Sequence, residues 1–193
     1  MKHILNIEEF YLNEISMKLL YIKCYENSFF DKCLVVEKNV DKELTKKVIE
    51  LIKNNRFDVN NYELFIKSYK CGKLATFLTN YTKDELIKEG IKTFKVHGYN
   101  IGFALKPIAS GMEIVALHNN EDAIGGIGEF LVKAAIEKGG NKLDHYDGFL
   151  SDFYEKLGFV EYARMKFKDE YADENWNYEL YGRPDIVFRE LKK

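Results

Sequence analysis

The stretch that decides the fold is Ala123-Ile124-Gly125-Gly126-Ile127-Gly128. The run before it, Met112 to His118, is rich in β-branched and apolar residues, which is typical of a strand. The run after it, Ile127 to Lys138, has apolar residues at helical spacing and stops at Gly139-Gly140. The glycines therefore predict a strand-to-helix turn at the start of a helix.

Such a turn has the physical features of an anion site. The first N–H groups of a helix lack intrahelical acceptors, the helix dipole favours negative charge, and glycine lets a phosphate approach the main chain. A tight structural turn is the alternative, because glycine also permits close packing. Two other phosphate-binding patterns do not fit, since Lys133 lies too far along the helix for G-x-x-x-x-G-K-[ST] and G-x-G-x-x-G is missing.

The residues after the loop alternate between strand and helix signals. Lys142 to Tyr146 predicts a short strand, and Phe149 to Leu157 predicts a short helix that ends at Gly158. Phe159 to Phe167 then alternates as a strand, and Asp185 to Arg189 predicts the last one.

The residues before the loop predict a helix followed by a meander. Thr82 to Glu85 is a capping box, and its helix is expected to end near Gly90. Three strand-like runs follow, separated by short turns: Thr93 to Val96, Ile101 to Lys106 and Met112 to His118. They predict an antiparallel meander that leads into the glycine loop.

In this order and spacing the chain resembles the GNAT superfamily of acyl-CoA-dependent N-acyltransferases, over about residues 82 to 193. The family's pyrophosphate loop, Q/R-x-x-G-x-G/A, is matched by Ala123 to Gly128. Its late helix, N-x-x-A-x-x-x-Y-x-x-x-G-F, is matched from Asp147 through Tyr154 to Phe159. The departures are Ala123, where the family usually has Gln or Arg, and Asp147, where it often has Asn.

The resemblance implies an α+β fold, with a mixed, mostly antiparallel central sheet flanked by helices. It implies an acetyl-CoA-dependent N-acetyltransferase that moves the acetyl group directly from the thioester to a primary amine, on a small molecule or a protein, without a metal. The alternative is a non-catalytic GNAT-like interaction module with a vestigial acyl-CoA site. The residues implied to contact the cofactor are Leu117, His118, Ala123, Ile124, Gly125, Gly126, Ile127, Gly128, Asp147 and Tyr154.

The resemblance also implies catalytic roles. A main-chain N–H at Leu117 or His118 would polarise the thioester carbonyl, and Tyr154 fits the general acid that protonates the departing thiolate. A packing role is the alternative for Tyr154, because Phe149 and Phe153 lie close to it in the sequence.

The general base has two candidates, Glu113 in the strand before the loop and His118 at its end. Strand alternation places Glu113, Val115 and Leu117 on one face and His118 on the other, so at most one candidate should face the substrate. A structural role for each residue, and a water-mediated route without a single base, remain alternatives.

Composition narrows the class of protein. The chain has 193 residues, 46% of them hydrophobic and 31% charged, with a net charge of -2, so it lacks the basic excess expected for nucleic-acid binding. It has no apolar run long enough to span a membrane, and the opening MKHILNIEEF lacks the apolar core of a signal peptide. We therefore expect a cytoplasmic protein whose Cys24, Cys33 and Cys71 are free thiols.

We expect residues 1–81 to form a helix-rich N-terminal extension or subdomain, because Gly72 is their only glycine and they contain no proline. Asp41 to Lys53 predicts a helix with Asp41 as its N-cap. This region could shape the substrate cleft, form a homodimer interface or bind a partner. Near the other end, Asp169 to Pro184 reads as a surface loop pinned by Trp176 and Tyr181, or as a site for an amine.

Overall fold

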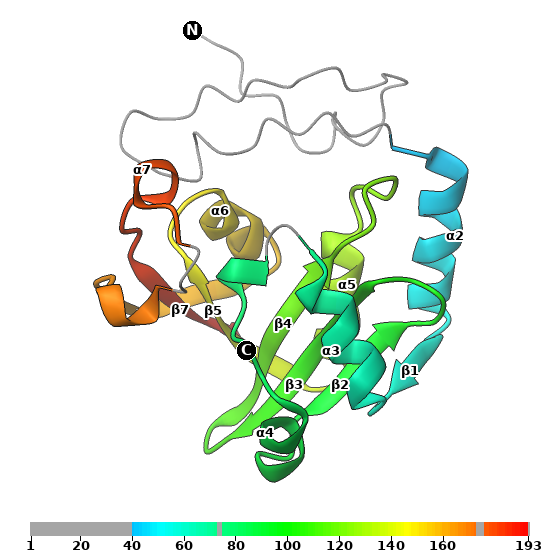
Figure 1. The fold of residues 1–193 in the computed structure, drawn as a ribbon, viewed down its shortest axis with the longest axis horizontal. Helices are drawn as coiled ribbons and strands as arrows, with labels where there is room; N and C mark the ends of the chain where they lie inside the picture. The colour runs from blue at the N-terminus through cyan, green and yellow to red at the C-terminus, as the bar shows by residue number, and fades with distance from the viewer. Residues whose placement is uncertain (1–39, 73–74, 173–175, 193) are drawn as a thin grey trace, which may run out of the picture.

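The computed structural model describes residues 40–72, 75–172 and 176–192, which form a seven-stranded sheet with helices on both faces (Figure 1). The strands are β1 Phe57–Val59, β2 Lys92–Val96, β3 Ile101–Ile108, β4 Gly111–Asn119, β5 Gly140–Tyr146, β6 Phe159–Met165 and β7 Ile186–Leu191. The α-helices are α2 Lys42–Lys53, α3 Tyr62–Lys70, α4 Lys83–Lys88, α5 Gly128–Glu137, α6 Phe149–Lys156 and α7 Tyr178–Tyr181. Two short 3₁₀ helices are η2 Ala75–Phe77 and η3 Asp169–Tyr171.

The strand order is β1-β2-β3-β4-β5-β7-β6, and every neighbouring pair is antiparallel except β4 and β5. The parallel pair is possible because α5 carries the chain back along one face of the sheet between these two strands. This confirms the expected α+β class with a mixed, mostly antiparallel sheet.

Local sequence signals account for most element boundaries. The Asp41 carboxylate accepts the Leu44 N–H at 2.9 Å and so caps α2, and Thr82 and Glu85 form the predicted capping box of α4. The predicted meander is present as β2, β3 and β4. Its second strand is longer than expected, because β3 continues through Pro107, opposite Met112, to Ile108. The three-residue β1 carries no sequence signal that predicted it.

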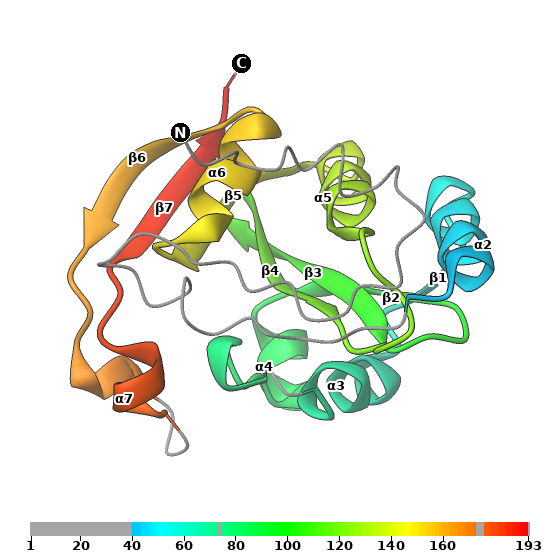
Figure 2. The same cartoon turned by 90° about the horizontal axis from the view of Figure 1, so that it is seen from above.

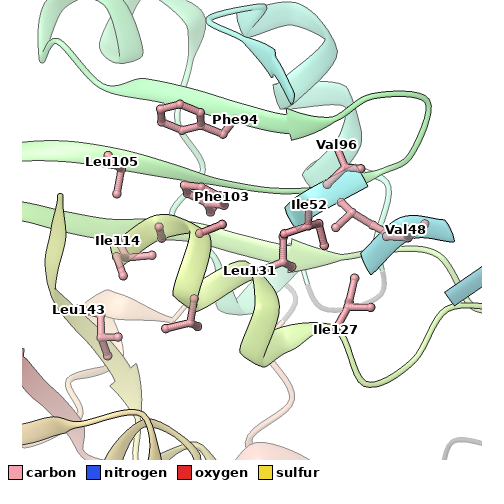
Figure 3. Packing of buried hydrophobic residues seen from close by; sticks show 14 of the residues in the cluster. Val48, Ile52, Phe94, Val96, Phe103, Leu105, Ile114, Ile127, Leu131 and Leu143 are labelled. Carbon is pink, nitrogen blue, oxygen red and sulfur yellow. The ribbon is translucent and has the colours of Figure 1, made fainter. Parts of the chain in front are cut away.

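Two hydrophobic cores lie on opposite faces of the sheet. In Figure 2, α2 and α5 cover one face of strands β2 to β4, while α3 and α4 cover the other. The first core joins α2 and α5 to the sheet, and Figure 3 shows Val48, Ile52, Ile127 and Leu131 gathered between these two helices and the strands. The remaining members that bury most completely in this core are Val96, Ile101, Ile124, Val132, Ala135 and Phe159.

The second core ties the region before residue 82 to the sheet. Phe65 and Tyr69 of α3 and the following Tyr81 pack with Leu86 and Ala104, and β1 pairs with β2. The described residues 40–81 thus share both cores with the later chain. The division into residues 1–81 and 82–193 stays a prediction. Residues 1–39, with Cys24 and Cys33, lie outside the described residues, and Cys71 is a free thiol.

Candidate active site

Two side chains of the glycine loop are buried in the core, while several of its backbone N–H groups have no acceptor in the described part of the chain. Ile124 and Ile127 are buried in the first core, and the Asn119 side chain donates to the Ile124 carbonyl at 2.8 Å. Gly126 has φ +67°, a conformation that favours glycine. Helix α5 begins at Gly128 without a side-chain cap.

Within the described residues, no backbone N–H from residue 125 to residue 130 donates to a protein acceptor. These groups surround the start of a ten-residue helix, where the dipole adds partial positive charge. The loop can therefore offer several donors to an anion without breaking any internal hydrogen bond. Ala123 is bonded to the residue that caps α2, since its carbonyl accepts the Asp41 N–H at 2.8 Å.

Strands β4 and β5 diverge close to this loop. They are in register only at Met112 with Gly140 and at Glu113 with Lys142. β4 continues to Asn119 and β5 to Tyr146 without further pairing between them. Main-chain groups along the diverging part of β4 that face β5 are therefore available to something other than the neighbouring strand.

A bulge in β4 changes which side chains share a face. Val115 lies opposite Ala104 and His118 opposite Gly102, so β4 has one more residue than β3 in this interval, and Ala116 has φ +48°. Glu113, Val115 and His118 therefore point to the same face, the one covered by α3 and α4. The expectation from simple alternation was wrong, because it requires an uninterrupted strand. Leu117 instead packs against the first core.

The structure places His118 inside the second core. Its Nδ1 lies 2.8 Å from the Ala116 carbonyl, which can only accept, so Nδ1 carries the hydrogen. Its Nε2 lies 2.9 Å from the Ser68 hydroxyl, and the rings of Phe65 and Tyr69 contact the imidazole. Burial lowers the pKa of His118 to about 4. The neutral imidazole thus ties the bulge to α3.

Glu113 occupies a different part of the same face, at the point where β4 and β5 part. Its side chain is half-buried, and burial, followed by the nearby Asp144 charge, raises the pKa of its carboxyl. Lys106 and Lys142 lie opposite Glu113 on the two neighbouring strands. Lys106 forms an ion pair with Glu89 at 2.8 Å, and Lys142 forms one with Glu190 at 3.4 Å.

Tyr154 lies in α6 and is 7% exposed. Its ring packs against His145, Phe153 and Phe159, so the packing role considered for it is present. Its hydroxyl makes no hydrogen bond within the described residues. Burial, and then the charge of Asp144, raises the pKa of Tyr154 above its usual range, which keeps the proton on the oxygen at neutral pH.

Asp147 precedes α6 and is already engaged. Its carboxylate accepts the Gly148 N–H at 3.1 Å and the Ser151 hydroxyl at 2.9 Å, and it pairs with Arg164. Burial acts to raise the pKa of Asp147, but the Arg164 guanidinium and the Ser151 hydroxyl hold it below its ordinary value. Asp147 therefore fixes the start of α6 and the adjoining β6.

Two features of the site region were missed from the sequence. Asp144 lies on the same face of β5 as Lys142, and so on the face of Glu113. It is open to solvent, yet the surrounding protein raises the pKa of its carboxyl. Buried Arg189 donates to Nε2 of His145 at 3.0 Å. Strand alternation alone could have placed Asp144, but only the β4–β5 register brings it beside Glu113.

The segment around Trp176 has the structural role that the sequence analysis considered. Trp176 is buried, and its ring contacts Phe77, Tyr146, Phe167 and Tyr181 with centroids 5.1 to 5.4 Å apart. Its indole N–H donates to the Gly182 carbonyl at 3.1 Å. The cluster joins the chain before and after α7 to β5 and η2.

Comparison with known proteins gives a distant structural likeness. No protein-family model matches the chain, and no curated protein matches it in sequence. Two solved structures of N-acetylglutamate synthase from Neisseria gonorrhoeae are similar in part. The complex with coenzyme A and N-acetyl-glutamate is 20% identical over 67% of this chain, with a TM-score of 0.41. The complex with coenzyme A and L-arginine is 21% identical over 66%, with a TM-score of 0.40.

The chain spans about a third of the length of these synthases, 32% and 31% respectively. None of the helices in the described ranges is both long and apolar enough to cross a bilayer.

Proposed function

We propose that this protein is an acetyl-CoA-dependent N-acetyltransferase that transfers the acetyl group directly from the thioester to a primary amine. The observation that carries the proposal is the proximity in sequence of two features: unbonded loop amides at the start of α5, and the parting of β4 from β5. The sequence motifs shared with the GNAT superfamily support the same interpretation.

In this proposal the loop Ala123 to Gly128 binds the diphosphate of acetyl-CoA through the backbone N–H groups of residues 125 to 128 and those of the first turn of α5, while the Ile124 N–H stays bonded to the Glu121 carbonyl at 3.1 Å. The pantetheine arm pairs with main-chain groups of β4 that β5 leaves free. A main-chain N–H at Leu117 or His118 polarises the thioester carbonyl. Asp147 contributes by holding the start of α6 in place.

The chemistry assigns each proton to a group. The acceptor ammonium gives its proton to Glu113, whose raised pKa makes it a better base near neutral pH. The neutral amine attacks the carbonyl carbon, the carbon–sulfur bond breaks, and the thiolate takes the proton of the Tyr154 hydroxyl. The nitrogen, which now carries one proton too many for an amide, releases that proton through solvent, and Tyr154 takes up a proton in its place. We assign His118 to support of the bulge, because both of its ring nitrogens are engaged and its pKa is about 4.

Calorimetric titration with acetyl-CoA tests the cofactor site. Gly126→Glu adds a side chain and a negative charge to the loop, so we expect acetyl-CoA affinity to fall by about tenfold or more. Gly98→Glu is the matched control, because Gly98 also has a positive φ, +82°, and open space around it. Wild-type affinity in Gly126→Glu would show that the loop is a structural turn. Acetyl-CoA binding without turnover of any amine would favour the non-catalytic module.

A further inference from the structure

Arg189 of β7 is a buried cation that the proposed chemistry does not use. It is 6% exposed and forms no ion pair within the described residues. Glu161 lies opposite it on β6, but Arg164 donates two hydrogen bonds to that carboxylate. These bonds lower the pKa of Glu161, and the charge of Arg189 adds to the effect. A buried charge without a close partner is costly, so its presence indicates a role that an apolar side chain could not fill.

The guanidinium of Arg189 holds two acceptors on different strands. Its Nε donates to Nε2 of His145 at 3.0 Å, and its Nη1 donates to the Phe159 carbonyl at 3.2 Å. Nδ1 of His145 lies 2.8 Å from the Tyr146 carbonyl. A guanidinium can only donate and a carbonyl can only accept, so His145 is the neutral imidazole with its hydrogen on Nδ1. The two hydrogen bonds together fix the orientation of the imidazole ring.

Both residues that Arg189 holds contact the ring of Tyr154. The ring centroids of His145 and Tyr154 lie 5.3 Å apart, and those of Phe159 and Tyr154 lie 6.1 Å apart. The third ring contact, with Phe153, comes from the preceding residue of the same helix. In the part of the chain that the structure describes, each ring contact between Tyr154 and the sheet thus involves a residue bonded to Arg189.

We propose that Arg189 is a positioning residue for the acid step, and that it holds the Tyr154 hydroxyl within reach of the departing thiolate by way of His145 and Phe159. This inference rests on the proposed function, in which Tyr154 gives its proton to the sulfur. Proton transfer needs a short and well-aligned contact, so a small displacement of the ring slows the chemical step without changing cofactor binding. Arg189 itself takes no part in the proton transfer.

A double-mutant cycle with Tyr154→Phe tests this role in the full chain. Arg189→Lys keeps the buried cation but loses the planar fork that holds both acceptors. Acetyl-CoA is the donor, and propylamine, spermidine and free lysine are the acceptor probes. We expect Arg189→Lys to lower kcat by about tenfold while acetyl-CoA affinity stays unchanged. In the Tyr154→Phe background the same substitution should leave kcat unchanged, because the proton that Arg189 positions is absent.

Two further variants make the cycle specific. His145→Phe keeps a ring beside Tyr154 but gives Arg189 no acceptor, so its loss of kcat should also depend on Tyr154, and it replaces Arg189→Lys if that variant does not fold. Arg56→Lys changes an exposed arginine between α2 and β1 and is the matched control, which should alter neither kcat nor affinity.

The outcomes separate this inference from the proposed function. Absence of acetyl-CoA binding in calorimetry would refute the proposed function. Binding without acetylation of any of the three amines would favour the non-catalytic module and remove the acid step together with this inference. Turnover with unchanged kcat in Arg189→Lys and His145→Phe would overturn this inference alone. So would the same fold-loss of kcat with and without the Tyr154 hydroxyl, because a merely structural role acts equally in both backgrounds.

Discussion

Acidification should weaken this fold through His118. The imidazole is buried and neutral, and the pKa of His118 is about 4 in the folded protein against an ordinary value of 6.5. Because the folded-state pKa lies below the unfolded one, its contribution to stability is complete above about pH 6.5 and is lost as the pH falls toward 4. A difference of about 2.5 pKa units limits the loss to about 3 kcal/mol, of which about 2 kcal/mol is already lost at pH 5.

The structure explains why the charge itself carries this cost. On protonation, Nε2 could donate to the Ser68 hydroxyl, which can donate in turn to the Phe65 carbonyl 2.7 Å away. No hydrogen bond need be lost, so the cost comes from placing a cation among the rings of Phe65 and Tyr69.

Urea unfolding of wild type and His118→Gln is measured at pH 8 and at pH 5. The contribution of His118 is the loss of unfolding free energy between these pH values in wild type minus the same loss in the variant. The wild type should lose about 2 kcal/mol more than the variant over this interval. His145→Gln serves as a matched control, since burial also lowers the pKa of His145 and its loss has the same sign. The imidazole proton shifts in wild-type NMR spectra give a second measurement. Equal losses in wild type and His118→Gln, or a His118 titration near pH 6.5, would refute the reasoning.

Three further predictions follow from the geometry. Tyr154→Phe keeps the ring contacts and removes the proton, so kcat should fall by about 10² with acetyl-CoA affinity unchanged; full activity in steady-state assays would leave packing as its only role. Glu113→Gln should be more stable than wild type at pH 7 and equal to it below pH 4, because the raised pKa of Glu113 means that the folded state disfavours the charged carboxylate. Equal urea midpoints of the two proteins at both pH values would contradict this. Arg189→Met should cost about 1–3 kcal/mol, since the Phe159 carbonyl and Nε2 of His145 lose their buried donor, and an unchanged midpoint would count against it.

Local patterns in the sequence were sufficient for most of the fold. The Asp41 cap, the Thr82 capping box and Gly158 define helix ends through contacts within a few residues, so neighbours in the chain determine them. The same holds for the strand–loop–helix order around Gly126, whose positive φ favours glycine.

Tertiary structure decided which chemical groups meet. The bulge at Ala116 put Glu113 and His118 on one face, and α3 then buried His118 through Ser68, fifty residues away in the chain. The β4–β5 register brought Asp144 beside Glu113. A bulge adds a single residue to a strand and leaves its composition unchanged, and strand pairing depends on long-range packing, so neither can be read from local periodicity.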